Sequence, residues 1–144
     1  LREATLALTR CCTTVGVVAR RADQLPGMHP LPGINPLPLD YRDSAALARA
    51  LRRAVEERGP VRLAVCWIHS TAPDALQTVA AELGRSGQPA AHRFDRQIIL
   101  GFQIEGERSR WLTHSEISQG ALEAIRDDAE YRVVGVVRPW DRRP

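Results

Sequence analysis

Two adjacent arginines, Arg20 and Arg21, directly follow the apolar run Thr-Val-Gly-Val-Val-Ala at residues 14–19. A valine-rich run without polar alternation is typical of a parallel strand that is buried on both faces. In open α/β sheets, ligands bind outside the carboxyl ends of such strands. Neighbouring guanidinium groups repel each other unless an anion lies near them, so the pair predicts an anion-binding strand end. The alternative interpretation is that both arginines only solvate the end of the strand.

His114 and Glu116 are a second pair with acid–base potential. Two residues apart on a helix, their side chains diverge. The segment Thr-His-Ser-Glu at residues 113–116 also matches a capping box, in which the threonine and the glutamate satisfy free amides of the first helical turn. Capping is therefore favoured over catalysis. The four histidines of the chain show no metal-ligand spacing, so we expect no metal site.

The length of 144 residues fits one globular domain over residues 1–144, and the 44% hydrophobic residues are enough to form its core. All twenty basic residues are arginine, so the chain contains no lysine. The net charge of +3 is small, and the arginines are interspersed with seventeen acidic residues. This distribution argues against nucleic-acid binding.

Cysteine usage and hydropathy indicate the cellular compartment. Cys11, Cys12 and Cys66 are an odd number of thiols without a CxxC motif, which favours a reducing compartment over a disulfide framework. No apolar stretch approaches the length of a membrane span, and no signal-peptide pattern opens the sequence. We therefore expect a cytoplasmic protein that does not bind membranes.

Helical and strand periodicities alternate along the chain. Residues 25–38, which hold five prolines and two glycines, predict an extended connection, and residues 105–112 predict a turn followed by a hairpin arm. Strands alternating with helices of about ten to fifteen residues predict parallel βαβ units and a doubly wound α/β sheet. The predicted strands are residues 14–19, 37–41, 61–68, 93–104 and 131–137, and the predicted helices are residues 1–10, 43–58, 73–84 and 113–125.

With these elements placed, the chain resembles the short-chain dehydrogenase/reductase group of Rossmann proteins. The resemblance rests on Val-Gly-Val-Val-Ala-Arg-Arg at residues 15–21, Leu-Asp-Tyr-Arg-Asp at 39–43 and Leu-Ala-Val-Cys-Trp-Ile-His at 63–69. Residues 98–102 (Ile-Ile-Leu-Gly-Phe) and 109–118 (Ser-Arg-Trp-Leu-Thr-His-Ser-Glu-Ile-Ser) resemble small bacterial proteins described as short-chain dehydrogenase-like. The resemblance covers essentially the whole chain and implies a Rossmann-like doubly wound parallel sheet that binds a dinucleotide.

The resemblance also implies roles for individual residues. Arg20 and Arg21 would face the adenosine ribose, where arginine pairs with a 2′-phosphate, so NADP is favoured over NAD. Asp40 would contact the adenine amino group, with Tyr41 beside it; the alternative is that Asp40 caps the following helix.

The end of the next predicted strand departs from the family pattern. Trp67, Ile68 and His69 occupy the place of a small Asn-Ala-Gly segment, which in the family passes the ribose and nicotinamide of the cofactor. Trp67 and Ile68 are therefore candidate cofactor-binding residues. His69 and Ser70 are the candidate catalytic residues, because they could donate to a phosphate or to a substrate carbonyl, and the alternative is that they only end a strand.

Two family motifs are missing from the sequence. No G-x-G-x-x-G occurs, and in related proteins a first strand and a glycine-rich loop lie immediately before the helix that begins here at Leu1. Because that strand is central in the family order 3-2-1-4-5-6, we expect it to precede this sequence or to come from another subunit. The catalytic Tyr-x-x-x-Lys cannot form without lysine.

The sequence thus predicts an NADP-binding, short-chain dehydrogenase-like protein that acts on an unknown small molecule as an atypical oxidoreductase. The alternative is a non-catalytic dinucleotide-binding sensor or protein-interaction module. Trp111 and Trp140 flank the last helix and strand, where we expect them to pack or to mark a contact in a homo-oligomer.

Overall fold

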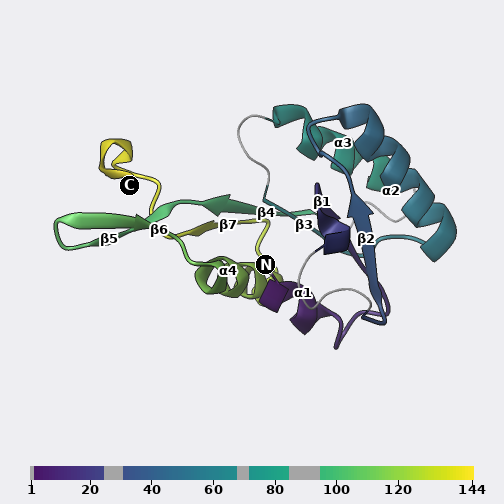
Figure 1. Ribbon diagram of the computed structural model, residues 1–144, viewed down its shortest axis with the longest axis horizontal. Helices are drawn as coiled ribbons and strands as arrows, with labels where there is room; N and C mark the ends of the chain where they lie inside the picture. The colour runs from purple at the N-terminus through teal and green to yellow at the C-terminus, as the bar shows by residue number, and fades with distance from the viewer. Residues whose placement is uncertain (1, 25–30, 68–71, 85–94) are drawn as a thin grey trace.

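The computed structural model describes residues 2–24, 31–67, 72–84 and 95–144, which form a mixed α/β fold (Figure 1). Its helices are α1 (Arg2–Leu8), α2 (Ser44–Arg58), α3 (Pro73–Gly84) and α4 (His114–Arg126), with two short 3-10 helices, η1 (Ala22–Gln24) and η2 (Trp140–Arg142). Its strands are β1 (Val15–Ala19), β2 (Ile34–Pro38), β3 (Ala64–Cys66), β4 (Asp95–Leu100), β5 (Phe102–Glu105), β6 (Arg108–Trp111) and β7 (Tyr131–Val134).

The strands form two parallel sheets and one antiparallel hairpin. β1 pairs with β2 from Val15↔Ile34 to Ala19↔Pro38, and a second sheet has the order β3-β4-β7. β5 and β6 form the hairpin, which extends away from the rest of the molecule (Figure 1). The predicted mixed α/β class with parallel strands is confirmed.

The second strand begins earlier than its sequence pattern predicts. β2 lies at residues 34–38, within the proline-rich stretch that we expected to be an extended connection, whereas the strand was predicted at 37–41. Pro36 and Pro38 lack an N–H but are compatible with a strand that pairs on one edge only. Within the described residues, β2 pairs only with β1, so it lies at a sheet edge.

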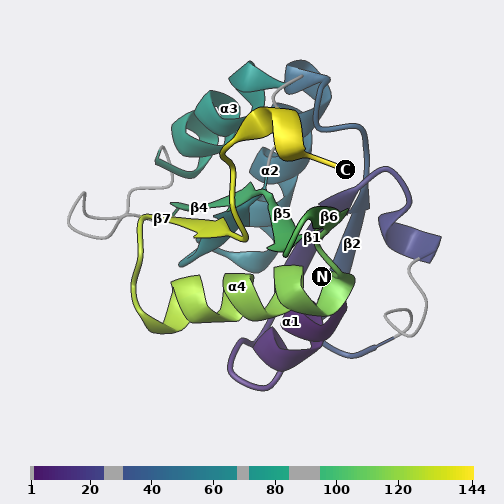
Figure 2. The same cartoon turned by 90° about the vertical axis from the view of Figure 1, so that its left-hand side faces the viewer.

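Helices cover the parallel strands from both sides. Leu47 and Leu51 of α2 pack with Val79 and Leu83 of α3 and with Cys66 of β3 in one hydrophobic cluster. On the other side, α1 and α4 pack against the second sheet in a cluster of small and aliphatic residues, namely Ala4, Ile98, Ala121, Ala124 and Val134. Figures 1 and 2 show α1 and α4 on one side of the strands, with α4 beneath β4 and β7, whereas α2 and α3 lie on the other side at the end of the molecule that holds β1, β2 and β3.

The long strand predicted at residues 93–104 is interrupted at Gly101, where the chain passes close to the segment around Gly135. At Gly101 a Cβ atom would collide with the carbonyl oxygen of Val136. Gly135 has φ +76°, and a Cβ there would lie 2.6 Å from the carbonyl oxygen of Phe102. This close approach allows Phe102 and Val136 to exchange hydrogen bonds of 2.9 and 2.8 Å. The chain therefore leaves the parallel sheet at Gly101 and enters the hairpin.

No helix in the described part of the chain is long and apolar enough to cross a membrane.

Candidate functional site

The carboxyl ends of β1 and β2 bring four of the predicted site residues to one edge. Arg20 and Arg21 directly follow β1, and Asp40 and Tyr41 lie just after β2. Because the two strands are parallel and in register, the N–H of Leu39 still donates to the carbonyl of Ala19, at 3.1 Å. The side chains of both Arg20 and Arg21 are exposed. The structure thus places an exposed arginine pair beside the Asp40 segment.

Asp40 is held by a neighbour that the sequence analysis did not single out, Arg42. The Arg42 Nε donates to both carboxylate oxygens at 2.9 and 3.0 Å, its Nη2 donates to Oδ2 at 2.5 Å, and its backbone N–H donates to Oδ1 at 3.0 Å. These hydrogen bonds lower the pKa of Asp40 to about 2, and the charge of Arg20 acts in the same direction. The spacing Asp-x-Arg in the sequence could have predicted this pairing, because an aspartate can accept from the backbone two residues further on in a local turn.

This pairing changes the charge of the strand ends. A carboxylate offers about four lone-pair sites, and Arg42 occupies them, so Asp40 has little capacity left to accept from an adenine amino group. Asp40 does not cap α2 either, because Asp43 does so by accepting from the N–H of Ala46 at 2.9 Å. With Asp40 neutralised by Arg42, Arg20 and Arg21 make the corner positive and able to hold an anion.

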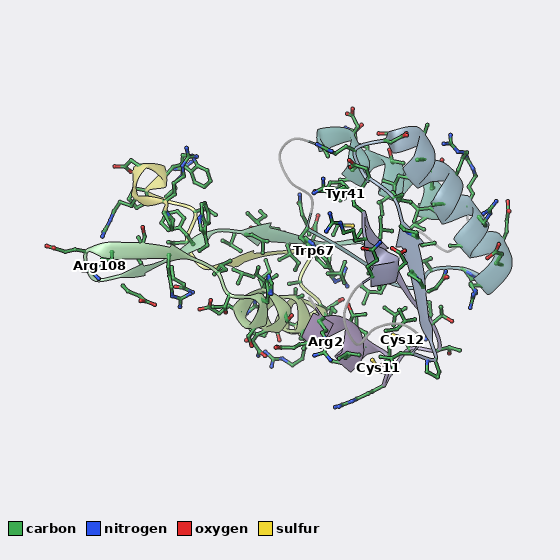
Figure 3. The ribbon with its side chains drawn as sticks, in the orientation of Figure 1. Arg2, Cys11, Cys12, Tyr41, Trp67 and Arg108 are labelled. Carbon is green, nitrogen blue, oxygen red and sulfur yellow. The ribbon has the colours of Figure 1, made fainter. Side chains whose placement is uncertain are left out.

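Tyr41 and Trp67 lie in different parts of the interior. Tyr41 packs half-buried against the cluster of α2 and α3, whereas Trp67, directly after β3, packs against the cluster of α1 and α4. Figure 3 shows both aromatic side chains near the centre of the molecule, with Cys11 and Cys12 beyond the opposite end of β1. The predicted site residues Ile68, His69 and Ser70 lie outside the described residues.

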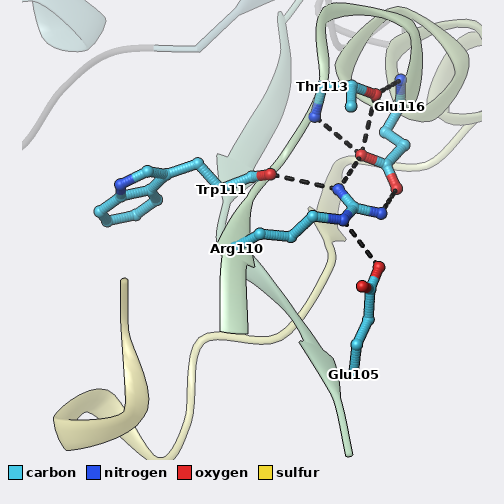
Figure 4. Close-up of polar contacts among 5 residues, drawn as sticks. All are labelled: Glu105, Arg110, Trp111, Thr113 and Glu116. Carbon is cyan, nitrogen blue, oxygen red and sulfur yellow. Dashed lines mark hydrogen bonds and ion pairs between the residues drawn. The ribbon is translucent and has the colours of Figure 1, made fainter. Parts of the chain in front are cut away.

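A polar cluster at the base of the hairpin holds the start of α4 (Figure 4). The Arg110 guanidinium donates to Glu105 at 2.7 Å and to both oxygens of Glu116 at 2.9 and 3.0 Å. Thr113 and Glu116 form the predicted capping box, which is confirmed. The Arg110 hydrogen bonds, followed by those from Thr113, lower the pKa of Glu116 to about 2. A carboxylate engaged in this way serves the fold rather than proton transfer with the exposed His114.

An open groove of about 420 Å³ runs between α4 and β7. Its charged side chains are already paired, since Arg132 donates to Glu123 at 2.6 Å and to Asp127 at 3.0 Å. Among the described residues that were predicted to bind a cofactor, none lines this groove. It is therefore not the strand-end site that the sequence predicted.

The thiols of Cys11 and Cys12 lie 4.0 Å apart, and burial raises the pKa of Cys12. In the described part of the chain, no group of three or more His, Cys, Asp or Glu side chains is arranged to hold a metal ion.

Comparisons of the chain with protein-family models, with curated proteins and with solved structures gave no match.

Proposed function

We propose that the chain is an NADP-binding, short-chain dehydrogenase-like protein whose two parallel sheets are halves of one Rossmann-like sheet. The strand order would be β2-β1-x-β3-β4-β7, where x is a first strand that leads through a glycine-rich loop into α1. The observation that carries the proposal is the pair of exposed arginines at the carboxyl end of β1, a strand that among the described residues pairs with β2 only.

The packing around β1 and β3 supports one common sheet. Val18 of β1 packs against the same cluster as Ala64 and Cys66 of β3. At the opposite end, Cys12 precedes β1 and Arg62 precedes β3, and the two are close enough for the Arg62 charge to act on the Cys12 thiol. The amino ends of β1 and β3 therefore lie near each other, as they do in neighbouring parallel βαβ units.

In the proposed sheet, the first strand would lie between β1 and β3, which do not pair with each other within the described residues. Adjacent strands lie about 4.8 Å apart, so one inserted strand fills twice that distance. α1 packs against α4 and leads directly into β1, so a strand at position x followed by α1 and β1 would complete a right-handed βαβ unit.

The proposed cofactor contact is at the adenosine end. Arg20 and Arg21 would hold the 2′-phosphate of NADP through charge-assisted hydrogen bonds, and Arg42 would keep the Asp40 carboxylate from repelling that phosphate. NADP, when bound, supplies a hydride to an acceptor or removes one from a donor. Trp67 follows β3 on the side toward α1 and α4 and supports the chain where it would pass the nicotinamide half. The roles of Ile68, His69 and Ser70 stay predictions from the sequence.

A second function is favoured by one observation, the complete absence of lysine. Without Tyr-x-x-x-Lys, the family's route for donating a proton to a carbonyl is closed. A non-catalytic sensor would bind NADPH with the same arginines and act through a protein partner. The two functions differ in one measurement, because only the oxidoreductase transfers hydride from bound NADPH to a carbonyl substrate.

The test is a titration of NADPH and NADH into the complete protein, followed by quenching of tryptophan fluorescence. We expect NADPH to bind more tightly than NADH. Arg20→Asp combined with Arg21→Ala should weaken NADPH binding by about 10- to 100-fold, the size of one or two lost charge-assisted hydrogen bonds, and should reverse the preference.

Arg108→Ala is the matched control, because Arg108 is an exposed arginine at the end of the hairpin, far from Tyr41 and Trp67 (Figure 3). It removes one positive charge outside the proposed site and should leave both affinities unchanged. The cofactor assignment fails if neither dinucleotide binds at sub-millimolar concentration. The strand-end assignment fails if NADPH binds and the double variant keeps the preference of the wild type.

A further inference from the structure

One face of the second parallel sheet is apolar and exposed. Ile98 and Val134 point toward α4 and are only 3% and 9% exposed. Because side chains alternate along a strand, Ile99 and Val133 point to the opposite face, where they are 37% and 39% exposed. They are register partners, and Tyr131, two residues before Val133, shares their face at 64% exposure.

The same apolar surface continues over the base of the hairpin. Phe102 is fully buried, and Trp111 is its register partner, so both lie on one face of the hairpin. The ring of Trp140 meets that of Phe102 edge-on at 6.4 Å, and Val136 bridges to Phe102. Figure 4 shows the Trp111 side chain on the side of β6 opposite to the Arg110 guanidinium. Trp111, Val136 and Trp140 all remain substantially exposed.

These six residues form what we call the β4–β7 face: Ile99, Trp111, Tyr131, Val133, Val136 and Trp140. In Figures 1 and 2, α4 lies on the other side of β4 and β7. None of the six belongs to either hydrophobic cluster of the interior. The fold of the described residues therefore leaves this face without a covering layer, although a sheet normally buries its apolar face against another layer.

The area of the β4–β7 face matches the needs of a protein interface. Together the six side chains expose roughly 500 Å² of apolar surface, at about 200 Å² for a complete large side chain. That is near the upper end of what a monomer leaves uncovered, about 300–600 Å². A standard interface takes about 800 Å² from each partner, of which somewhat more than half is apolar.

The charge pattern identifies the partner. The register pairs Gln97↔Tyr131 and Ile99↔Val133 in the centre of the face carry no charge, whereas at its end near the hairpin the Arg143 guanidinium lies 4.8 Å from the centre of the Trp140 ring. A two-fold dimer places the same patch of both copies in contact. The uncharged centre of the face can therefore meet its own copy without like-charge repulsion, and each apolar residue there is buried in both copies at once.

We propose that a second copy of this chain packs against the β4–β7 face, so that the protein is a two-fold dimer held by sheet-on-sheet contact. Two sheets that pack face to face lie about 10 Å apart, with their side chains interdigitated. Ile99 and Val133 then lie in the centre of the interface, and Trp111 and Trp140 cover its end near the hairpin. This interface is independent of the proposed dinucleotide site, which lies at β1 and β2.

The test is sedimentation equilibrium of the complete protein over a range of concentrations up to millimolar. The wild type should be a dimer. Ile99→Glu and Val133→Glu, made separately, each place two carboxylates near the two-fold axis and should raise the dissociation constant of the dimer by about 100-fold or more. Leu31→Glu is the matched control, because Leu31 is 40% exposed and lies outside the face, and it should leave the dimer intact.

Hydroxyl-radical footprinting of the unmodified protein gives a second readout that needs no folded variant. Trp111 and Tyr131 should be protected at concentrations where the dimer forms and reactive on dilution, whereas Leu31 should react equally throughout. A protein that stays monomeric at all concentrations overturns the proposal. If Trp111 and Tyr131 are protected in that monomer, another part of the same chain covers the β4–β7 face. A dimer whose affinity is unchanged in Ile99→Glu and Val133→Glu, folded by circular dichroism, overturns it too.

Discussion

Gly120 lies at the contact between α4 and β7, where the structure leaves no room for a side chain. A Cβ atom on Gly120 would collide with Cγ2 of Val134 and would lie 3.1 Å from its Cγ1 and 3.2 Å from its Cβ. Non-bonded carbon atoms prefer about 3.5–4.0 Å. Val134 is buried and β-branched, so it cannot easily rotate away. We predict that Gly120→Ala destabilises the protein, although alanine is normally the better helix former.

The magnitude follows from two opposing effects. Replacing an interior helical glycine by alanine contributes about 1 kcal/mol of stability. Overpacking at a rigid contact costs about 1–3 kcal/mol. Because two carbon atoms of Val134 would be within 3.2 Å and a third would overlap, we expect the upper half of that range, and hence a net loss of about 1 kcal/mol. For a chain of 144 residues this lowers the Tm by roughly 3 °C.

The assay is a double-mutant cycle measured by urea unfolding. Val134→Ala removes the methyl groups that meet Gly120, so Gly120→Ala in that background should stabilise the protein by up to about 1 kcal/mol. The sign reversal corresponds to a coupling of about 2 kcal/mol. Gly84→Ala is the control, because a Cβ there meets nothing within 4 Å. The packing argument is refuted if Gly120→Ala stabilises the wild type or has the same effect in both backgrounds.

Two further predictions concern the hairpin and its connection to α4. The pKa of Glu116 is about 2 in the folded protein, below its unfolded value of about 4.3, so its stabilising effect is complete above that value and is lost as the pH falls toward 2. Glu116→Gln should therefore lower the Tm at pH 7 and leave the Tm almost unchanged near pH 2. An equal change in Tm at the two pH values would contradict a stabilising role for the Glu116 charge. Phe102→Ala should reduce the free energy of unfolding by about 3–5 kcal/mol, because the ring is fully buried, and a urea titration that shows a loss below about 1 kcal/mol would contradict this packing.

Features that depend on residues close together in the chain could be predicted from local sequence patterns. The capping box at Thr113 and Glu116 was predicted from a four-residue pattern and is present. The bounds of α3 were predicted at residues 73–84, where the structure has them, because a proline starts the helix and a glycine ends it. The helix predicted from residue 43 does begin there, with Asp43 as the cap that accepts from the N–H of Ala46. Each of these signals acts within one helical turn, so no distant contact can readily override it.

Features that depend on contacts between distant segments could not be predicted in this way. The predicted strand at residues 93–104 is broken at Gly101, and β7 ends at Val134 rather than at residue 137, because Phe102 and Val136 meet across a close backbone approach. The strand at β2 formed within the proline-rich segment because β1 was available to pair with it. The strand propensity of a segment contains no information about which distant strand is available to pair with it.

The candidate site divides in the same way. That Arg20 and Arg21 end a strand could be predicted from the valine run before them, and β1 does end at Ala19. The pairing of Asp40 with Arg42, and the separation of Tyr41 from Trp67 into two hydrophobic clusters, could not. The charge of a strand end depends on which side chains neutralise one another, and the position of an aromatic ring depends on which helix covers it. Both are set by the packing of the whole chain, and they decide whether the arginines at β1 face an anion.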